Sequence, residues 1–487
     1  MKSEKEKTSQ ASSEEVKTRD VVKKLKKTLE NEHPNLWDTA TAEEISEINA
    51  FADQYKSFLD RGKTERDFVT VTVETLESLG YEPLRGKTSL KAGDKVYQTI
   101  RGKAINAAII GQRPLADGCN LVGAHVDAPR LDLKPHPVYE DSDLVLLKTH
   151  YYGGIKKYQW AAIPLAIHGI VYRMDGSPVT ISIGESADDP VMTITDLLPH
   201  LGKEQMSRKA PDLIKGEELN ILVGGLPYPD TDTSGRFKLA ILKLLHDRYQ
   251  ITERDLISAE LEIVPAGQAR DVGLDRSFIG AYGQDDRVCA YTALAALTSL
   301  NTTDKTVVCM LFDKEEVGSD GNTGAQSRAY ENFLYELLAR SEQQADRLSF
   351  QMMIENSKML SADVTNAYDP TFSSVSDSRN NNYLNRGISL VKYTGSRGKS
   401  GTSDANVEFL NEVIRTFEAN DIPWQTGEMG KVDEGGGGTI AKFLANLGME
   451  VLDCGVPVLS MHSPFEITSK MDVYMTFQAY RVFFEHI

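Results

Sequence analysis

Two adjacent carboxylates follow an apolar run in the C-terminal half of the chain. Residues 306–312 are short, apolar and rich in β-branched side chains, which predicts a strand buried on both faces of a sheet. Glu315 and Glu316 come shortly after this run, and Gly318 lets the chain turn away. Ligands and catalytic groups of open α/β sheets gather at the carboxyl ends of strands, so the pair is a candidate site. Taken alone, an acidic pair more often begins a solvated loop.

Other predicted elements also end in side chains that can bind a metal. Three further strands, predicted within 121–129, 359–363 and 456–462, stop at an aspartate or a histidine, and one helix begins beside an aspartate. These further candidates are His125, Asp127, Asp285, Asp363 and His462. Each alone is more typical of a core histidine or a helix cap. Their coincidence favours a functional site, because an ordinary core does not collect so many acids and imidazoles at one edge.

The residue types in this set suggest a pair of divalent metal ions. Two histidines and three carboxylates are enough to hold two cations when one carboxylate is shared, and a further carboxylate can take a proton from the bridging water. Asp127 stands two residues after His125 and is placed to accept a hydrogen bond from the second imidazole nitrogen. Mixed imidazole and carboxylate ligation favours zinc, although cobalt or manganese would also fit.

Five motifs together resemble those of the M18 aminopeptidases, the group of aspartyl aminopeptidase and aminopeptidase I. They occur in the family's order, at similar spacing, from about residue 40 to the C-terminus. The motifs are GAHVDAP at 123–129, DDR at 285–287, FDKEEVGS at 312–319, SAD at 361–363 and SMHS at 460–463. Singly they are weak signals, and together they are a strong one.

The resemblance implies a role for each candidate residue. It implies two zinc sites that share one carboxylate, with the ligands His125, Asp285 and Asp363 for one ion and Asp285, Glu316 and His462 for the other. Glu315 would be the general base, and Asp127 would be the partner of His125. The substrates would be peptides with a free N-terminus.

Substrate preference and assembly are also expectations from the resemblance. It implies a homo-oligomer, a tetrahedral dodecamer, whose inserted β domain makes dimer contacts. His200 is a candidate for a histidine that family members lend to a neighbouring active site, and a structural histidine is its alternative. Lys392 matches a family lysine near the substrate side chain, with an ordinary solvated lysine as its alternative. Asn366 and Asp369 stand where the eukaryotic aspartyl enzymes carry histidines, so the preference for acidic or neutral residues stays open.

The order of predicted elements indicates an α/β protein with an insertion. We expect a central mixed, mostly parallel sheet with helices on both faces, as in zinc peptidases. Short β runs interrupt this pattern within 134–236, with a hairpin candidate at Asp175-Gly176. They predict an inserted, β-rich dimerisation or lid domain. The expected divisions are a charged tail over 1–20, a split metallopeptidase domain over 21–133 and 237–487, and the inserted domain over 134–236.

Composition limits the possible partners and the compartment. A formal net charge of −17 repels phosphate backbones and anionic membranes, so nucleic acid and membrane partners are not expected. The N-terminus lacks the apolar run of a secretion signal, and no run approaches the roughly 18 apolar residues of a membrane span. The four cysteines lie far apart without a CxxC pair, which favours reduced thiols in a cytoplasmic protein.

Two competing functions remain open at this point. A carboxypeptidase or deacylase of the same clan would use similar metal ligands but would need a cation to hold a substrate carboxylate. A non-catalytic assembly protein on the same scaffold would typically have lost ligands or the base, whereas every position is filled here. The segment 395–400 resembles the end of a P-loop, but Tyr393 stands where the first glycine belongs, so nucleotide binding receives little weight.

Overall fold

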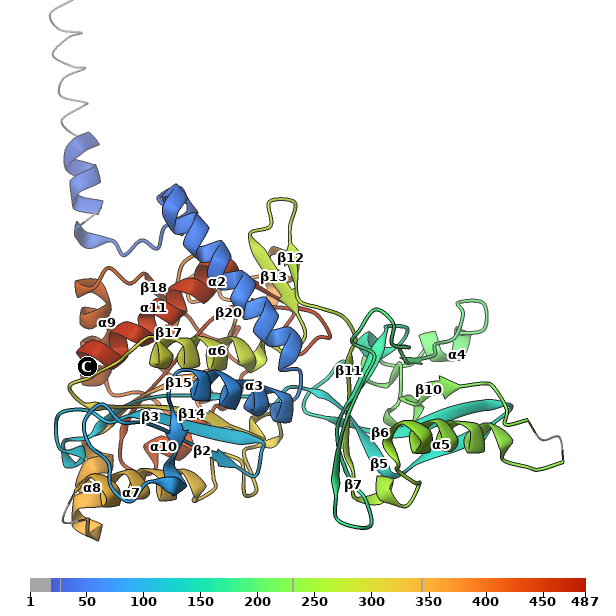
Figure 1. Cartoon of the computed structure of the whole chain (residues 1–487). Coiled ribbons are helices and arrows are strands. Elements are labelled where there is room, and N and C mark those ends of the chain that lie inside the picture. The colour runs from blue at the N-terminus through green and yellow to red at the C-terminus, as the bar shows by residue number, and fades with distance from the viewer. Residues whose placement is uncertain (1–18, 27, 230–231, 343–344) are drawn as a thin grey trace, which may run out of the picture.

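A computed structural model describes residues 19–26, 28–229, 232–342 and 345–487. It shows a large α/β domain beside a smaller, β-rich inserted domain (Figure 1). The expected fold class is confirmed: a mixed central sheet carries helices on both faces, and a second sheet forms the insertion. The charged tail expected over 1–20 lies almost entirely outside the described residues.

The central sheet has nine strands. Their spatial order is β1 (Glu82–Pro83), β2 (Lys95–Ile100), β3 (Ala104–Ile109), β14 (Thr306–Phe312), β4 (Cys119–His125), β15 (Lys358–Ala362), β19 (Glu450–Gly455), β17 (Ile388–Val391) and β18 (Trp424–Thr426). The four middle strands β14, β4, β15 and β19 run parallel to one another. Their carboxyl ends therefore meet at one edge, where the candidate ligands follow.

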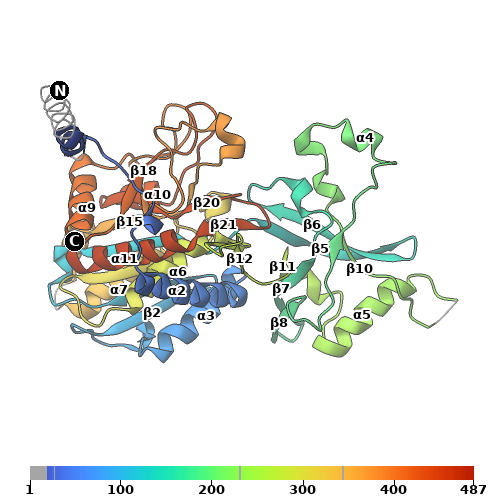
Figure 2. The same cartoon turned by 90° about the horizontal axis from the view of Figure 1, so that it is seen from above.

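Helices cover both faces of this sheet (Figures 1 and 2). One face carries α2 (Ala42–Arg61), α3 (Glu65–Ser78), α6 (Gln284–Thr298), α9 (Val407–Ala419) and α11 (Lys470–His486). The other carries α7 (Ala329–Ser341), α8 (Arg347–Glu355) and α10 (Ala441–Ala445). All seven residues of β14 are buried, and they alternate between the two cores. The prediction of a strand buried on both faces is confirmed.

The inserted domain is built on a seven-stranded sheet. Its order is β8 (Pro178–Ile183), β7 (Leu165–Tyr172), β11 (Glu260–Pro265), β5 (Arg130–Asp141), β6 (Leu144–Tyr152), β10 (Ile221–Gly224) and β9 (Thr193–Ile194). The helices α4 (Lys203–Met206) and α5 (Arg236–Tyr249) follow β9 and β10 in the chain. The hairpin predicted at Asp175-Gly176 joins β7 to β8.

The second sheet extends beyond the expected limits 134–236. Strand β5 begins at Arg130, and β11 pairs with β5 and β7 as far as Pro265. Helix α5 packs against this sheet through Phe237 and Ile241 instead of returning to the α/β domain. The sequence expectation missed this because an amphipathic helix shows the same periodicity whichever sheet it covers.

A third, five-stranded sheet lies near the carboxyl edge of the central sheet. It consists of β12 (Arg270–Val272), β13 (Phe278–Ala281), β21 (Glu466–Ser469), β20 (Pro457–Leu459) and β16 (Thr365–Asn366). The strand expected over 456–462 ends at Leu459, because Ser460 and His462 have positive φ angles of 58° and 63° and form a turn. His462 therefore lies in that turn and not on the strand. No helix among the described residues is long and apolar enough to cross a membrane.

Candidate metal centre

A cavity of about 1070 Å³ opens where the parallel strands end. One wall comes from the α/β domain and includes Asp285, Glu315, Glu316, Asp363 and His462. Residues 154–156 of the inserted domain line the cavity as well. Five of the predicted site residues thus line one cavity, whereas His125 and Asp127 are buried and are not among its lining residues.

Asp285 lies between the two histidines. Its Oδ1 is 3.2 Å from Nε2 of His125, and its Oδ2 is 3.2 Å from Nε2 of His462. The main chain of Asp285 is also held, because its N–H donates to the Glu466 carboxylate at 3.0 Å. One buried carboxylate therefore presents each of its oxygens to a different imidazole.

Asp127 orients His125. The Nδ1 of His125 lies 3.0 Å from the main-chain oxygen of Asp127 and 3.2 Å from its carboxylate. This arrangement turns Nε2 toward Asp285 and the cavity. The expected pairing of the two residues is present in the geometry, with the main chain contributing as well as the side chain.

The Glu315–Glu316 pair sits in a short 3-10 helix, η8 (Glu315–Val317), directly after β14. The N–H groups of both residues donate to the Asp127 carboxylate, at 3.1 and 3.2 Å. Oε1 of Glu316 lies 3.4 Å from Nε2 of His462, and Oε2 of Glu315 lies 3.9 Å from Nε2 of His125. The two neighbouring glutamates therefore face different imidazoles from one rigid turn.

Asp363 follows β15 and completes the cluster. Its Oδ1 is 4.0 Å from Nε2 of His125. Asp286 also approaches these residues, and its Oδ2 accepts the N–H of His125 at 3.3 Å. The peptide bond between Asp285 and Asp286 is cis. Asp286 was missed as a site residue in the sequence, where the only signal was its place beside Asp285.

Three further contributors were also missed: Tyr152 and Gly154 come from the inserted domain, and Glu466 begins the strand that follows the His462 turn. Tyr152 donates its hydroxyl to the Asp127 carboxylate at 2.8 Å. The carbonyl of Gly154 lies 2.8 Å from Nδ1 of His462. Glu466 accepts the N–H of His462 at 2.7 Å as well as that of Asp285. No local sequence motif marks these residues.

Burial and charge shift the pKa values of the cluster. Burial raises the pKa of Glu315 to about 7, and the positive charge of His125 offsets part of that effect. For His462, burial favours the neutral form, but the hydrogen bond to Asp285 and the charge of Glu316 raise its pKa to about 10. Burial alone would raise the pKa of Asp127, but the hydrogen bond from His125 keeps the Asp127 pKa below its usual value. Without a cation, the site therefore holds protons on its imidazoles at neutral pH.

The donor set fits divalent cations. Oδ1 of Asp285 and Oε1 of Glu316 are buried, and each faces an imidazole nitrogen, at 3.2 and 3.4 Å, without the geometry of a hydrogen bond to any described residue. Buried carboxylate oxygens without a partner are costly unless a cation compensates them. Two groups offer ligand atoms within 4.8 Å of one another: His125, Asp285 and Glu316, and His125, Asp286 and Asp363. Imidazole and carboxylate ligands together suit zinc and its neighbours among the transition metals.

The two candidate substrate residues do not line the cavity. Lys392 forms an ion pair with Asp404, and its side chain is 40 % exposed, although its neighbours Val391 and Tyr393 are in the wall. His200 is exposed in a turn of the inserted domain, before α4. The roles suggested for both residues stay predictions.

Comparison with known proteins identifies the family. The family described as "Aminopeptidase I zinc metalloprotease (M18)" matches residues 58–484. A probable M18 family aminopeptidase 1 of Clostridium acetobutylicum is 48% identical over 460 residues, covering 93% of this chain and 98% of that protein. Its counterpart in Thermotoga maritima is 46% identical over 459 residues, covering 94% and 100%.

Solved structures agree with the sequence matches. The crystal structure of the M18 family aminopeptidase from Thermotoga maritima superposes with a TM-score of 0.91 at 46% identity, over 94% of this chain and all of that one. Aminopeptidase I from Clostridium acetobutylicum gives a TM-score of 0.87 at 47% identity, with the same coverage. The chain therefore belongs to the M18 family and is a metal-dependent aminopeptidase, as the resemblance implied.

Proposed function

We propose that this chain removes the N-terminal residue of peptides with the help of two divalent cations, and that Glu315 is its general base. The observation that carries the proposal is the position of Asp285, whose two oxygens each face Nε2 of a different histidine at 3.2 Å. A carboxylate in that position is suited to be the shared ligand of a metal pair.

The resemblance to the M18 family assigns the remaining ligands. His125 and Asp363 would complete one site, and Glu316 and His462 would complete the other, and the members of each pair lie within 4.0 Å of one another. We prefer Asp285 to Asp286 as the shared ligand, because Asp285 lines the cavity and Asp286 is not among the lining residues. Zinc is the metal that the family description supports, and cobalt or manganese would also suit the ligands.

Bound cations would supply the electrostatic part of the chemistry, by lowering the pKa of a bridging water and polarising the scissile carbonyl. Glu315 lines the cavity beside the ligands, and the resemblance to the M18 family gives it the role of the base. It can take the proton of the attacking water and then deliver it to the leaving amine. Its N–H donates to Asp127 at 3.1 Å, which holds the turn that carries it.

The cavity wall carries charges of both signs. Asp285, Glu315, Glu316 and Asp363 line it, and two divalent cations would offset their negative charge. Lys156, Arg397, Lys399 and Lys431 line it as well. The charge distribution therefore does not separate an aminopeptidase from a same-clan carboxypeptidase or deacylase, and family membership favours the aminopeptidase.

Assembly into a homo-oligomer, a tetrahedral dodecamer, and a cytoplasmic location stay predictions from the sequence. A set of apolar side chains on the inserted domain supports an oligomer, because they are exposed in the single chain. They are Leu197, Leu198, Leu201, Leu226, Leu239 and Leu244. His200 lies within this set, so a role in a neighbouring active site would require that these residues form a subunit interface. A native mass measurement tests the assembly directly.

Matched peptides test the proposed reaction. The chain should hydrolyse a free-amine peptide, lose that activity after complete chelation and regain it with added zinc. The same peptide with an acetylated N-terminus should not be cleaved. Cleavage of the acetylated peptide, or of a free-amine peptide at its C-terminal bond, would overturn the aminopeptidase assignment, and absence of activity at every metal load would support the non-catalytic alternative. A panel of acidic and neutral N-terminal residues then decides the preference.

A further inference from the structure

The last turn out of strand β6 lies directly against the proposed metal ligands. Tyr152 is the final residue of β6 and donates its hydroxyl to Oδ2 of Asp127 at 2.8 Å. Two residues later, the carbonyl of Gly154 lies 2.8 Å from Nδ1 of His462. Residues 152–154 belong to the inserted domain. Tyr152 nevertheless contacts Asp127, the partner of His125, and Gly154 contacts the His462 imidazole itself.

Gly153 brings this segment close to a third ligand. A Cβ atom at Gly153 would lie 3.3 Å from Oε2 of Glu316, and the residue has a φ of +72°. Side chains other than hydrogen are disfavoured in that backbone region. A glycine is therefore required for the segment to pass so near Glu316.

Arg130 fixes the segment from the opposite strand. Arg130 and Tyr152 are cross-strand partners at the ends of β5 and β6, and the guanidinium lies 3.9 Å from the centroid of the Tyr152 ring. A guanidinium over a tyrosine ring at this distance is attracted to the face of the ring. The stack therefore restricts the direction in which the Tyr152 hydroxyl points.

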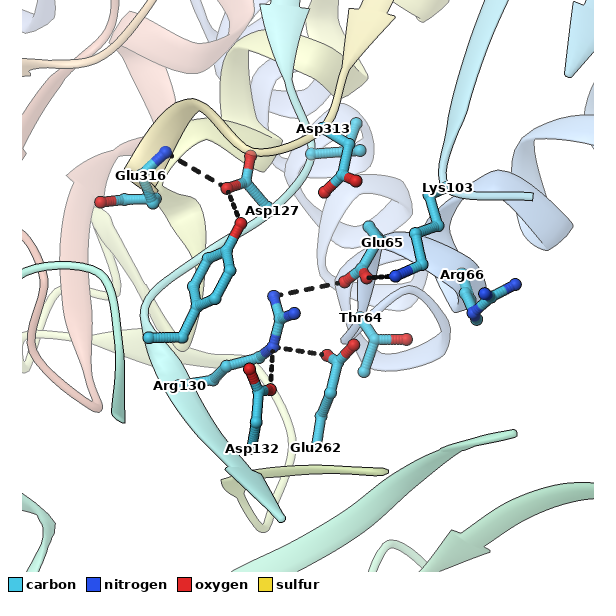
Figure 3. Close-up of polar contacts among 12 residues, drawn as sticks. Thr64, Glu65, Arg66, Lys103, Asp127, Arg130, Asp132, Glu262, Asp313 and Glu316 are labelled. Atoms are coloured by element: carbon cyan, nitrogen blue, oxygen red, sulfur yellow. Dashed lines mark hydrogen bonds and ion pairs between the residues drawn. The ribbon is translucent and has the colours of Figure 1, made fainter. Parts of the chain in front are cut away.

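Arg130 is in turn held by acids from three elements (Figure 3). Its contacts are Glu65 of α3 at 3.4 Å, Asp132 of β5 at 2.8 Å and Glu262 of β11 at 3.2 Å. Arg130, Glu65 and Glu262 are buried, where breaking a paired charge is costly. Glu65 opens a helix of the α/β domain, so the network ties both domains to the same arginine.

We infer that residues 152–154, held by Arg130, position the metal ligands, so that the inserted sheet is part of the support of the metal centre. Tyr152 orients Asp127, which holds His125 and the N–H groups of Glu315 and Glu316. Gly154 orients His462 through its carbonyl. The inference rests on the proposed metal pair and assigns Tyr152 as a positioning residue, not a catalytic one. Outer partners of this kind commonly matter about 10- to 100-fold in metal affinity or activity.

The Tyr152→Phe variant tests the inference. It removes one hydroxyl and keeps the ring that stacks on Arg130. We expect zinc affinity, measured by competition with a chelator of known affinity, to fall by about 10- to 100-fold. At saturating zinc, kcat should fall while KM changes little, because Tyr152 is not among the residues that line the cavity. The matched control is Tyr151→Phe, since Tyr151 precedes it in β6, points to the other face and is 41% exposed.

A readout on the metal-free protein separates positioning from general stability. Hydrogen exchange at the Glu315 and Glu316 amides should quicken in Tyr152→Phe, because Asp127 is then free to turn away from them. Exchange in the α7 and α8 amides should match the control. Unchanged zinc affinity and unchanged exchange in Tyr152→Phe, beside an intact wild-type metal pair, would overturn this inference alone. A wild-type protein that binds no zinc would instead overturn the proposed function.

Discussion

Oδ2 of Asp285 and Nε2 of His462 lie 3.2 Å apart, and the other oxygen of the same carboxylate lies at the same distance from His125. Asp285 is buried, which alone would raise its pKa, but the imidazoles of His125 and His462 at 3.2 Å outweigh that effect and lower the pKa, so the carboxylate stays ionised. A single negative group thus connects two imidazoles that come from opposite ends of the chain. Substitution of this group should affect both proposed metal sites together.

The Asp285→Asn variant tests the shared role. Asparagine keeps the shape but removes the charge, so we expect fewer than two zinc ions per chain. Turnover should fall by at least about 100-fold, because loss of a residue that only supports a metal ligand already costs up to about 100-fold. Elemental analysis after gel filtration measures the zinc content. Asp304→Asn, at an exposed position, is the control. Two tightly bound zinc ions in Asp285→Asn would contradict the shared ligand.

The Glu315→Gln variant separates metal binding from proton transfer. Because Glu315 is assigned to the proton and not to a cation, zinc content should stay at the wild-type level. Turnover should fall by about 10²- to 10⁴-fold, the usual contribution of a general acid–base group. Steady-state kinetics on a free-amine peptide, with metal analysis of the same sample, measures both effects. Wild-type turnover in this variant would remove Glu315 as the base.

Zinc affinity should rise with pH. In the metal-free protein the pKa of His462 is about 10, above its ordinary value, so the imidazole carries a proton throughout the neutral range. Only the neutral imidazole can bind a metal, so each binding event below about pH 10 must release that proton. Calorimetric titration with zinc in buffers of different ionisation enthalpy measures the protons released. A zinc affinity that does not change between pH 6 and pH 9, with no proton release, would be inconsistent with His462 as a ligand.

The strand that carries the glutamate pair should be sensitive to truncation. Phe312 is fully buried, and its ring centroid lies 4.3 Å from that of Tyr330. Replacing Phe312 with alanine should lower the free energy of unfolding by about 3–5 kcal/mol. The exposed Leu348→Ala serves as the control and should stay within about 0.5 kcal/mol of the wild type. Equal urea midpoints for the two variants would contradict the placement of Phe312 in the packed core.

Much of the candidate site follows from the sequence because its residues obey a rule of position. His125, Asp363 and the Glu315–Glu316 pair come at or just after parallel strands, and such ends meet at one edge. The approximate places of the helices also follow from periodicity, as for α2, where Thr41 and Glu44 form the capping box that the sequence suggests.

The remaining contributors depend on tertiary contacts that no local pattern encodes. Tyr152 and Gly154 reach the site from the inserted sheet, and Glu466 reaches it from β21, a strand of the third sheet. The apolar periodicity of helix α5 is the same whether the helix covers the first or the second sheet. The predicted end of the insertion at residue 236 therefore lies before α5, although α5 packs on the inserted sheet. His462 lies in a turn with positive φ angles, which are uncommon outside glycine and which no pattern in the sequence marks.

Zinc titration of the metal-free protein, with bound zinc and peptidase activity followed in the same samples, tests the central claim most directly. The shared position of Asp285 predicts two zinc ions per chain at saturation. It also predicts that peptidase activity requires both zinc ions to be bound. Hydrolysis of a free-amine peptide at full rate with no metal bound, or saturation at zero or one ion per chain in the active enzyme, would contradict the dinuclear account.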